Sequence, residues 1–432
     1  MRSRWLLLAL LVGLSARVAF EAQLAPYPRQ ERILNLLDDQ SFFVDWAAAM
    51  AKGERLDLAR SPHEWAYWAA RQPHLPPQAP LYPALLALLS LLVGSAPVWI
   101  RALQVAAGLA TVAGVFLVAR RRFGEAAAAL AALGAALYAP WIFFEATVLR
   151  TSWLVLFFVA IVVALDALSP KKSLAERSRR LAAFGVGALL GLAVLLQEQF
   201  LLLAIAGAVW LARRRRHGAR WLLLGGAAVL LPLVVGASLR AGRPVLSTAS
   251  APFNLLIANL HDAGGQQPST TPTYDAVKAA DALAPVDPLR ALAADLVSHP
   301  GAFPRLVARK IGFLVRPVEI PNNVNYYLGR RENRALRWIP FDYPTLLPLA
   351  IVGFVLALRG ARSAAPLLTL AAVYAATLVA FAPLARLRQP LALVVIVFAA
   401  AGATELWRRL PARPALALLA AIALLSLGAL LR

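Results

Sequence analysis

The run VWIRALQVAAGLATVAGVFLVA, from Val98 to Ala119, is followed at once by the triplet Arg120, Arg121 and Arg122. It is close to the roughly 20 apolar residues that carry a helix across a bilayer, and arginines directly beyond such a run mark the cytoplasmic side. Similar runs recur along the 432 residues, of which 60% are hydrophobic. The pattern predicts an all-α polytopic membrane protein, because the strands of a barrel would show weaker, alternating segments.

The net charge of +22 fits the same prediction. Its basic clusters lie in short connections between apolar runs, as in cytoplasmic loops, so nucleic-acid binding is not predicted. With the N-terminus inside, about eleven spans of near-bilayer length place every dense basic cluster on one side. The expected spans are residues 5–24, 98–119, 126–143, 147–168, 181–196, 200–212, 221–239, 343–358, 364–383, 391–407 and 414–431.

The long polar segments of the chain are expected on the outer side. We expect an N-terminal transmembrane module over residues 1–239 with a first outer loop at 25–97, a small extracytoplasmic helical subdomain at 240–342, and a C-terminal transmembrane module at 343–432. The apolar stretch 81–93 is short for a span, and a crossing there would put the arginine triplet outside. It is therefore expected to be a juxtamembrane helix. The chain has no cysteine, which excludes disulfides and thiolate chemistry.

The first outer loop contains the acidic stretch LLDDQSFFVDWA, from Leu36 to Ala47. Apolar residues recur at helical spacing after Asp39, which suits a helix lying in the membrane interface. The adjacent carboxylates of Asp38 and Asp39 could serve as a general base at the water–lipid boundary. Asp39 could equally be an N-cap of this helix, and Asp45, further along, is expected on its solvated face.

Residues 181–212 are expected to form a hairpin of two crossings, each of about 16 residues and so shorter than a bilayer requires. Its tip, Gln197, Glu198 and Gln199, then lies below the outer surface, where polar groups need protein or water around them. The tip is either a satisfied helix turn or part of the wall of a substrate groove. Gly187, in the first crossing, indicates close packing of helices.

Four groups of motifs, in this order, resemble the GT-C superfamily of membrane glycosyltransferases, especially the bacterial relatives of the dolichyl-phosphate-mannose–protein mannosyltransferases and of the lipid A aminoarabinose transferase. They are DQSFFVDWA from Asp39 with PLYP from Pro80, YAPWIFFE ending at Glu145, the segment from His299 to Asn323 ending in EIPNN, and ARLRQP from Ala385 to Pro390. The likeness extends along most of the chain.

The resemblance implies a sugar donor carried on a polyprenyl phosphate or diphosphate in the outer leaflet. Transfer to a hydroxyl or other nucleophile outside the cytoplasm would invert the anomeric carbon, with Asp39 as the base or orienting group. A multi-pass protein of the bacterial inner membrane is implied, with a cytoplasmic N-terminus and a site facing the periplasm. Membrane lipid and an extracytoplasmic acceptor are the expected partners, while the sugar and the acceptor stay open.

Such a transfer also needs cations beside the leaving phosphate. Arg386 and Arg388 lie between two apolar runs, on the side where arginine is scarce, and their planar groups suit phosphate oxygens. They could instead contact lipid headgroups or form ion pairs. Arg309 and Lys310 are second candidates, with a basic helix face over anionic lipid as the alternative.

Further residues are candidates for contact with substrate. Tyr82 of the PLYP motif and Glu198 of the hairpin tip are expected to bind it. Glu145 could orient an acceptor, hold a divalent metal together with Asp39, or cap a helix. Arg150 stands where relatives have an aspartate, which weighs against the metal.

The histidines carry less information. His63 and His74 share the first outer loop with Glu64, but their spacing fits no zinc pattern, so solvated loop residues are expected. His299, which precedes a proline, is expected to cap a helix or turn the chain.

Two other classes of function compete with the transferase. A transporter or flippase of a lipid-linked or small solute would show charges near the membrane midplane and interrupted helices in matching halves, but the acidic residues concentrate in the outer loops. A polymerase or ligase of surface polysaccharide would share lipid-linked sugars and outer arginines. The position of Asp39 directly after the first span favours the transferase.

Overall fold

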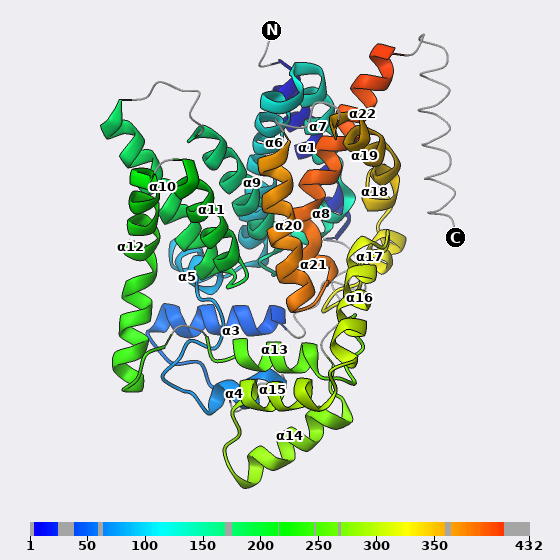
Figure 1. The fold of residues 1–432 in the computed structure, drawn as a ribbon. Coiled ribbons are helices and arrows are strands. Elements are labelled where there is room, and N and C mark those ends of the chain that lie inside the picture. The colour runs from blue at the N-terminus through cyan, green and yellow to red at the C-terminus, as the bar shows by residue number, and fades with distance from the viewer. Residues whose placement is uncertain are drawn as a thin grey trace.

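The computed structural model describes residues 4–24, 39–58, 64–168, 175–214, 216–245, 248–266, 269–358 and 364–409. Asp38, His63 and the expected span at 414–431 lie outside these residues. The described chain is nearly all helical (Figure 1), which confirms the predicted fold class. An apolar bundle of long helices stands above a layer of shorter helices, and this outer layer closes one end of the bundle.

The bundle accounts for the apolar runs of the sequence. Its helices are α1 (Arg4–Leu24), α6 (Pro97–Phe123), α7 (Glu125–Ala136), α8 (Ala139–Glu145), α9 (Thr151–Ala167), α10 (Glu176–Leu196), α11 (Phe200–Arg214), α12 (Arg216–Ala241), α19 (Tyr343–Leu358), α20 (Ala365–Ala380) and α22 (Ala392–Arg409). Within the described residues, five helical stretches are long and apolar enough to cross a membrane, and shorter apolar helices accompany them. The chain is thus a multi-pass membrane protein, and the count of eleven spans stays a prediction.

The expected span at 126–143 is divided in two. Helix α7 ends at Ala136, Tyr138 is extended, and α8 starts at Ala139 with Pro140 in its first turn. Proline has no N–H to donate, and its ring would clash with the carbonyl four residues before it, so α7 cannot continue past Ala136 into Pro140. The freed Ala139 amide donates to the carbonyl of Phe341 at 2.7 Å.

Glycines allow the bundle helices to approach closely. A Cβ at Gly187 on α10 would fall on the backbone of Leu222 on α12, and one at Gly225 would fall on the backbone of Phe184. Small residues at such crossings let two backbones pack without side chains between them. Gly187 therefore has the packing role that the sequence indicates.

The outer layer is built from both polar segments. Its elements are α3 (Asp39–Lys52), α4 (Glu64–Ala70), α5 (Leu81–Val93), α13 (Ala251–Asn259), α14 (Pro272–Leu283), α15 (Pro288–Ser298) and α16 (Ala302–Val315). The second polar segment continues beside the bundle as α17 (Tyr326–Glu332) and α18 (Arg334–Trp338), which pack against α8 (Figure 1). The turn of α21 (Ala385–Arg388) and η3 (Gln389–Leu391) connects α20 to α22. Figure 1 shows α3 lying across the direction of the bundle helices.

Helix α5 has the dimensions of a juxtamembrane helix. Its 13 residues extend about 20 Å at 1.5 Å per residue, less than the hydrocarbon thickness of about 30 Å. One side packs against α3, where the rings of Tyr82 and Phe43 meet edge to face at 5.1 Å. Leu91 and Leu92, on the other side, are 67% and 72% exposed and suit contact with lipid.

The two polar segments contact each other, as segments on the same side of a membrane can. The Tyr67 hydroxyl donates to Asp281 at 2.9 Å, and the Trp68 indole donates to the Tyr274 hydroxyl at 3.3 Å. At the opposite end of the bundle, a cavity brings Arg122 together with Arg408 and Arg409. Basic residues are not confined to that end, because Arg330, Arg331, Arg334 and Arg337 lie on α17 and α18 of the second polar segment.

Candidate active site

A cavity of about 330 Å³ opens where the bundle meets the outer layer. Its volume falls in the range of small-ligand sites, about 300–1,000 Å³. Amide side chains, apolar residues of α13, and Phe381 and Ala382 just after α20 line part of it. Its charged lining residues come from five separate segments of the chain: Asp39, Glu64, Arg150, Glu198 and Arg386.

Asp39 and Arg386 form an ion pair in the wall of this cavity. Asp39 lies in the first turn of α3, Arg386 lies on α21, and their Oδ2 and Nη2 atoms are 2.6 Å apart. Both side chains are largely buried, at 13% and 12% exposure. The start of α3 is fixed by Gln40, whose side chain accepts a hydrogen bond from the amide of Val148 at 2.8 Å. Two residues from opposite ends of the chain thus face each other across one site.

Arg150 adds a second guanidinium that the sequence reasoning did not select for binding. It precedes α9 and donates to the Gln78 side chain at 3.2 Å and to the carbonyl of Leu196 at 3.3 Å. Its charge interacts with those of Arg386 and Asp39. The signal that singled out Arg386, an arginine at the outer end of a span, also applies to Arg150 and could have found it.

The tip of the α10–α11 hairpin forms part of the cavity wall. Gln197, Glu198 and Gln199 all line it, and the Glu198 carboxylate accepts a hydrogen bond from the amide of Thr248 at 3.0 Å. The side-chain oxygens of Gln197 and Gln199 are buried and make no hydrogen bond to the described protein. Buried polar groups in native proteins are normally satisfied, so these amides favour a site for water or a polar ligand.

The EIPNN motif supplies another part of the wall through Asn322 and Asn323. Asn323 has a φ of 64°, the left-handed conformation that asparagine tolerates better than most residues. Such backbone conformations cluster at functional sites, and they persist only where surrounding contacts hold them in place. Here the ion pair of Glu319 with Arg388, at 3.1 Å, holds the segment that precedes Asn323.

Arg388 differs from Arg386 in its surroundings. It is not among the cavity-lining residues; it is buried and donates to the carbonyls of Arg316 and Val318 at 2.6 and 2.8 Å. Residues two apart on a helical turn point in different directions, so the two arginines cannot share one ligand easily. The structure therefore assigns Arg388 to holding α21 against the segment before Asn322, rather than to the cavity.

Glu145 and Tyr82 lie outside the cavity. The Glu145 carboxylate accepts two hydrogen bonds from Arg17, at 2.5 and 2.7 Å, and both residues are buried. It does not meet Asp39, so the structure does not assemble the metal pair considered from the sequence. The Tyr82 hydroxyl reaches the Gln104 side chain at 3.5 Å, and Gln104 donates to backbone carbonyls at positions 145 and 147. Tyr82 thus supports the loop that leads to Arg150.

Lys310 and Arg309 also point elsewhere. The Lys310 ammonium donates to the Asn259 side chain at 2.8 Å and to the carbonyl of Phe381 at 2.9 Å. Burial lowers the pKa of Lys310 to about 8. Arg309 donates to the carbonyls of Ala263 and Gly264. Phe381 lines the cavity, whereas Lys310 does not. Lys310 therefore contacts a residue of the cavity wall from behind, through its hydrogen bond to the Phe381 carbonyl.

Glu64 has a larger role than the sequence indicated. It lines the cavity and accepts hydrogen bonds from Lys278 at 2.6 Å and from the Tyr274 hydroxyl at 2.9 Å. The hydrogen bond from Lys278 is the main cause that lowers the pKa of Glu64, so this carboxylate is ionised at neutral pH. Hydropathy and spacing in the first outer loop could not reveal partners that lie on α14.

The fold has counterparts among the solved structures of other proteins. It is similar to that of the Archaeoglobus fulgidus oligosaccharyltransferase in its apo form, with a TM-score of 0.50 and 12% identity over 98% of this chain and 54% of that chain. For the complex of the same protein with Zn and sulfate, the TM-score is 0.51 at 13% identity, over 97% of this chain and 51% of that one. This chain therefore spans about half the length of the oligosaccharyltransferase.

The sequence adds a family match. Residues 76–238 match the family of dolichyl-phosphate-mannose-protein mannosyltransferases. A more distant likeness is to ArnT from Cupriavidus metallidurans bound to undecaprenyl phosphate, with a TM-score of 0.40 and 14% identity over 95% of this chain and 81% of that one. No curated protein matches the sequence. The family match and the shared fold confirm the resemblance to GT-C glycosyltransferases.

Proposed function

We propose that this protein is a membrane glycosyltransferase that moves a sugar from a polyprenyl-phosphate-linked donor to an acceptor on the outer side, with inversion. The observation that carries the proposal is the meeting of Asp39 and Arg386 at 2.6 Å in a cavity at the end of an apolar bundle. An acid and a cation that flank one reacting centre are what glycosyl transfer to a phosphate leaving group requires. The family match over residues 76–238 supports this class of reaction.

The proposed reaction assigns roles to three of the charged groups in the cavity. The acceptor oxygen attacks the anomeric carbon, and the bond from that carbon to the phosphate oxygen breaks with its electron pair passing to the phosphate. Asp39 takes the acceptor proton as general base. Arg386 and Arg150 stabilise the negative charge on the departing phosphate.

The ion pair of Asp39 with Arg386 gives the site a resting arrangement. A donor phosphate competes with the carboxylate for the guanidinium, so donor binding releases Asp39 to accept a proton. Base and cation would then be separated by the reacting atoms. Amide groups such as Gln199 and Asn323 can bond sugar hydroxyls, while the prenyl chain stays with the lipid because a cavity of about 330 Å³ is too small to hold it as well.

The test is transfer from a panel of labelled polyprenyl-phosphate sugars in proteoliposomes. Asp39→Asn keeps the shape of the side chain and removes the base, so transfer should fall by about 10²–10⁴-fold. Asp45→Asn, on the exposed face of the same helix, is the matched control and should transfer at the wild-type rate. Full activity of Asp39→Asn would remove the base assignment, and a wild-type protein inactive with every donor would refute the proposed function.

A further inference from the structure

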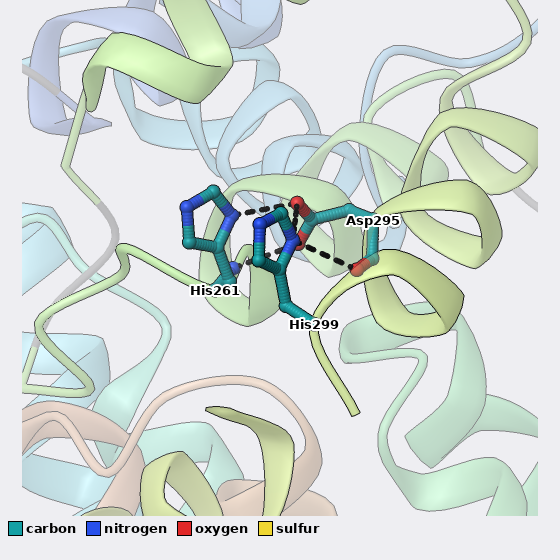
Figure 2. A group of neighbouring side chains, drawn as sticks. All are labelled: His261, Asp295 and His299. Atoms are coloured by element: carbon teal, nitrogen blue, oxygen red, sulfur yellow. Dashed lines mark hydrogen bonds and ion pairs between the residues drawn. The ribbon is translucent and has the colours of Figure 1, made fainter. Parts of the chain in front are cut away.

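Three side chains of the outer layer converge away from the cavity. His261 follows α13, Asp295 lies in the last turn of α15, and His299 caps the end of that helix. Figure 2 shows both imidazole rings beside the Asp295 carboxylate. One potential ligand atom from each residue lies within 4.8 Å of the other two. From the sequence, His299 was expected to cap a helix or turn the chain, and His261, which lies far from it along the chain, was not considered.

The distances are close to those that a metal ion imposes. Tetrahedral zinc holds nitrogen and oxygen ligands at about 2.0–2.2 Å, which separates neighbouring ligand atoms by about 3.3 Å. The His299 Nδ1 atom lies 3.3 Å from Asp295 Oδ1. The His261 Nδ1 atom lies 2.6 Å from the same oxygen, at hydrogen-bond distance. Replacement of that hydrogen bond by a metal ion needs the His261 ring to move outward by less than 1 Å.

The surroundings of the cluster also suit a metal. The Asp295 carboxylate is only 7% exposed and is fixed by the His261 amide, which donates to its second oxygen at 2.8 Å. Such supporting hydrogen bonds orient a ligating group. The His299 side chain is 45% exposed, which leaves an entry path and room for a water ligand. The rings stack with centroids 3.7 Å apart, so one ring must tilt for both lone pairs to reach one ion.

We propose that His261, Asp295 and His299 bind one divalent transition-metal ion of the zinc class, through both Nδ1 atoms and the carboxylate, with water as the fourth ligand. Two imidazoles and one carboxylate match the preference of zinc over magnesium or calcium, which favour oxygen ligands. This site is independent of the proposed transferase activity.

The ion would join the ends of two helices. His261 follows α13, which supplies Phe253, Asn254 and Ile257 to the cavity wall, while Asp295 and His299 belong to α15. A metal that links these ends would fix α13 in place. Bound metal is therefore expected to stabilise the outer layer, which gives a readout that does not require catalysis.

The test uses the full-length protein, purified in detergent without a polyhistidine tag and stripped with a chelator. Titration with zinc chloride in a calorimeter should show one tight equivalent, and cobalt(II) should give the absorption of a tetrahedral site. His299→Ala and the double variant H261A/H299A should bind at least about 100-fold more weakly, since loss of a direct ligand exceeds the effect of a supporting residue. His74→Ala, a histidine outside the cluster, is the control and should bind as the wild type does.

Thermal unfolding supplies a second measurement. Zinc should raise the apparent melting temperature of the wild type and of His74→Ala, but not that of His299→Ala. His299→Ala keeps the proposal testable if the double variant does not fold, because the exposed ring bonds only to Asp295 within the described residues. Absence of a stoichiometric site in the wild type, or equal zinc affinity of the wild type and His299→Ala, would overturn the proposal.

Discussion

The buried pair of Arg17 and Glu145 leads to a prediction about a glycine. Gly108 lies on α6 directly against the Glu145 carboxylate, and an added Cβ there would overlap its oxygens. The carboxylate cannot give way easily, because Arg17 holds both oxygens and itself donates to the carbonyls of Gly13 and Ala136 at 3.1 Å. The adjoining cavity has a volume of about 10 Å³, little more than one water-sized sphere. Gly108→Ala should therefore separate the ion pair.

Two opposing effects set the magnitude. Alanine is more favourable than glycine within a helix by about 1 kcal/mol. Separation of a buried ion pair costs about 3–5 kcal/mol, because each charge is left without its partner. The second effect is larger, so Gly108→Ala should lower the free energy of unfolding by about 2–4 kcal/mol. Glu145→Gln should destabilise the protein in the same direction without any steric overlap.

The measurement is thermal unfolding in detergent, with Gly185→Ala as the control. Gly185 lies within α10, and an added Cβ there meets nothing within 4 Å, so the helix preference for alanine acts alone. The control should match or exceed the wild type in melting temperature, and Gly108→Ala should melt several degrees lower. Equal melting temperatures for the two variants would refute the reasoning. Folded Glu145→Gln should keep its transfer rate, since Glu145 lies outside the cavity.

Three further predictions separate groups in the cavity from groups that support it. Arg386→Gln should reduce transfer by about 10²–10³-fold. It should lower the melting temperature less than Arg388→Gln does, because the Arg388–Glu319 pair is more deeply buried than the Arg386–Asp39 pair. The reverse ranking would contradict the assigned roles. Arg150→Met should reduce transfer by about 10-fold or more, since one charged hydrogen bond contributes about 1.5–3 kcal/mol, and an unchanged rate would exclude Arg150 from phosphate binding. The pKa of Lys310 is lowered to about 8 in the folded protein, whereas an ordinary lysine has a pKa of about 10.4. Between these two pH values the unfolded chain binds more protons than the folded protein does, so the contribution of Lys310 to the free energy of unfolding should rise with pH across this interval. Lys310→Met should remove this rise in a pH series of melting temperatures, and identical profiles would show that Lys310 is not buried as the structure has it.

The class of protein followed from local features of the sequence. Hydropathy sums over adjacent residues, so the run from Val98 to Ala119 identifies a membrane helix wherever the rest of the chain lies. The arginine triplet after it orients that helix by the same local rule. Asp39 was selected from its place after the first span and from the resemblance to GT-C proteins, and Arg386 from its turn between two apolar runs and from the same resemblance.

Partners were decided by the tertiary structure. Glu145 was a candidate for the site, but the rotation of α1 and α8 in the bundle turns it toward Arg17. Arg150, Arg386 and Arg388 carry the same guanidinium group. Arg150 and Arg386 line the cavity, whereas Arg388 is buried and donates to backbone carbonyls. An ion pair depends on distances of a few ångströms between segments far apart in the chain, and the order of residues along one segment holds no information about that distance.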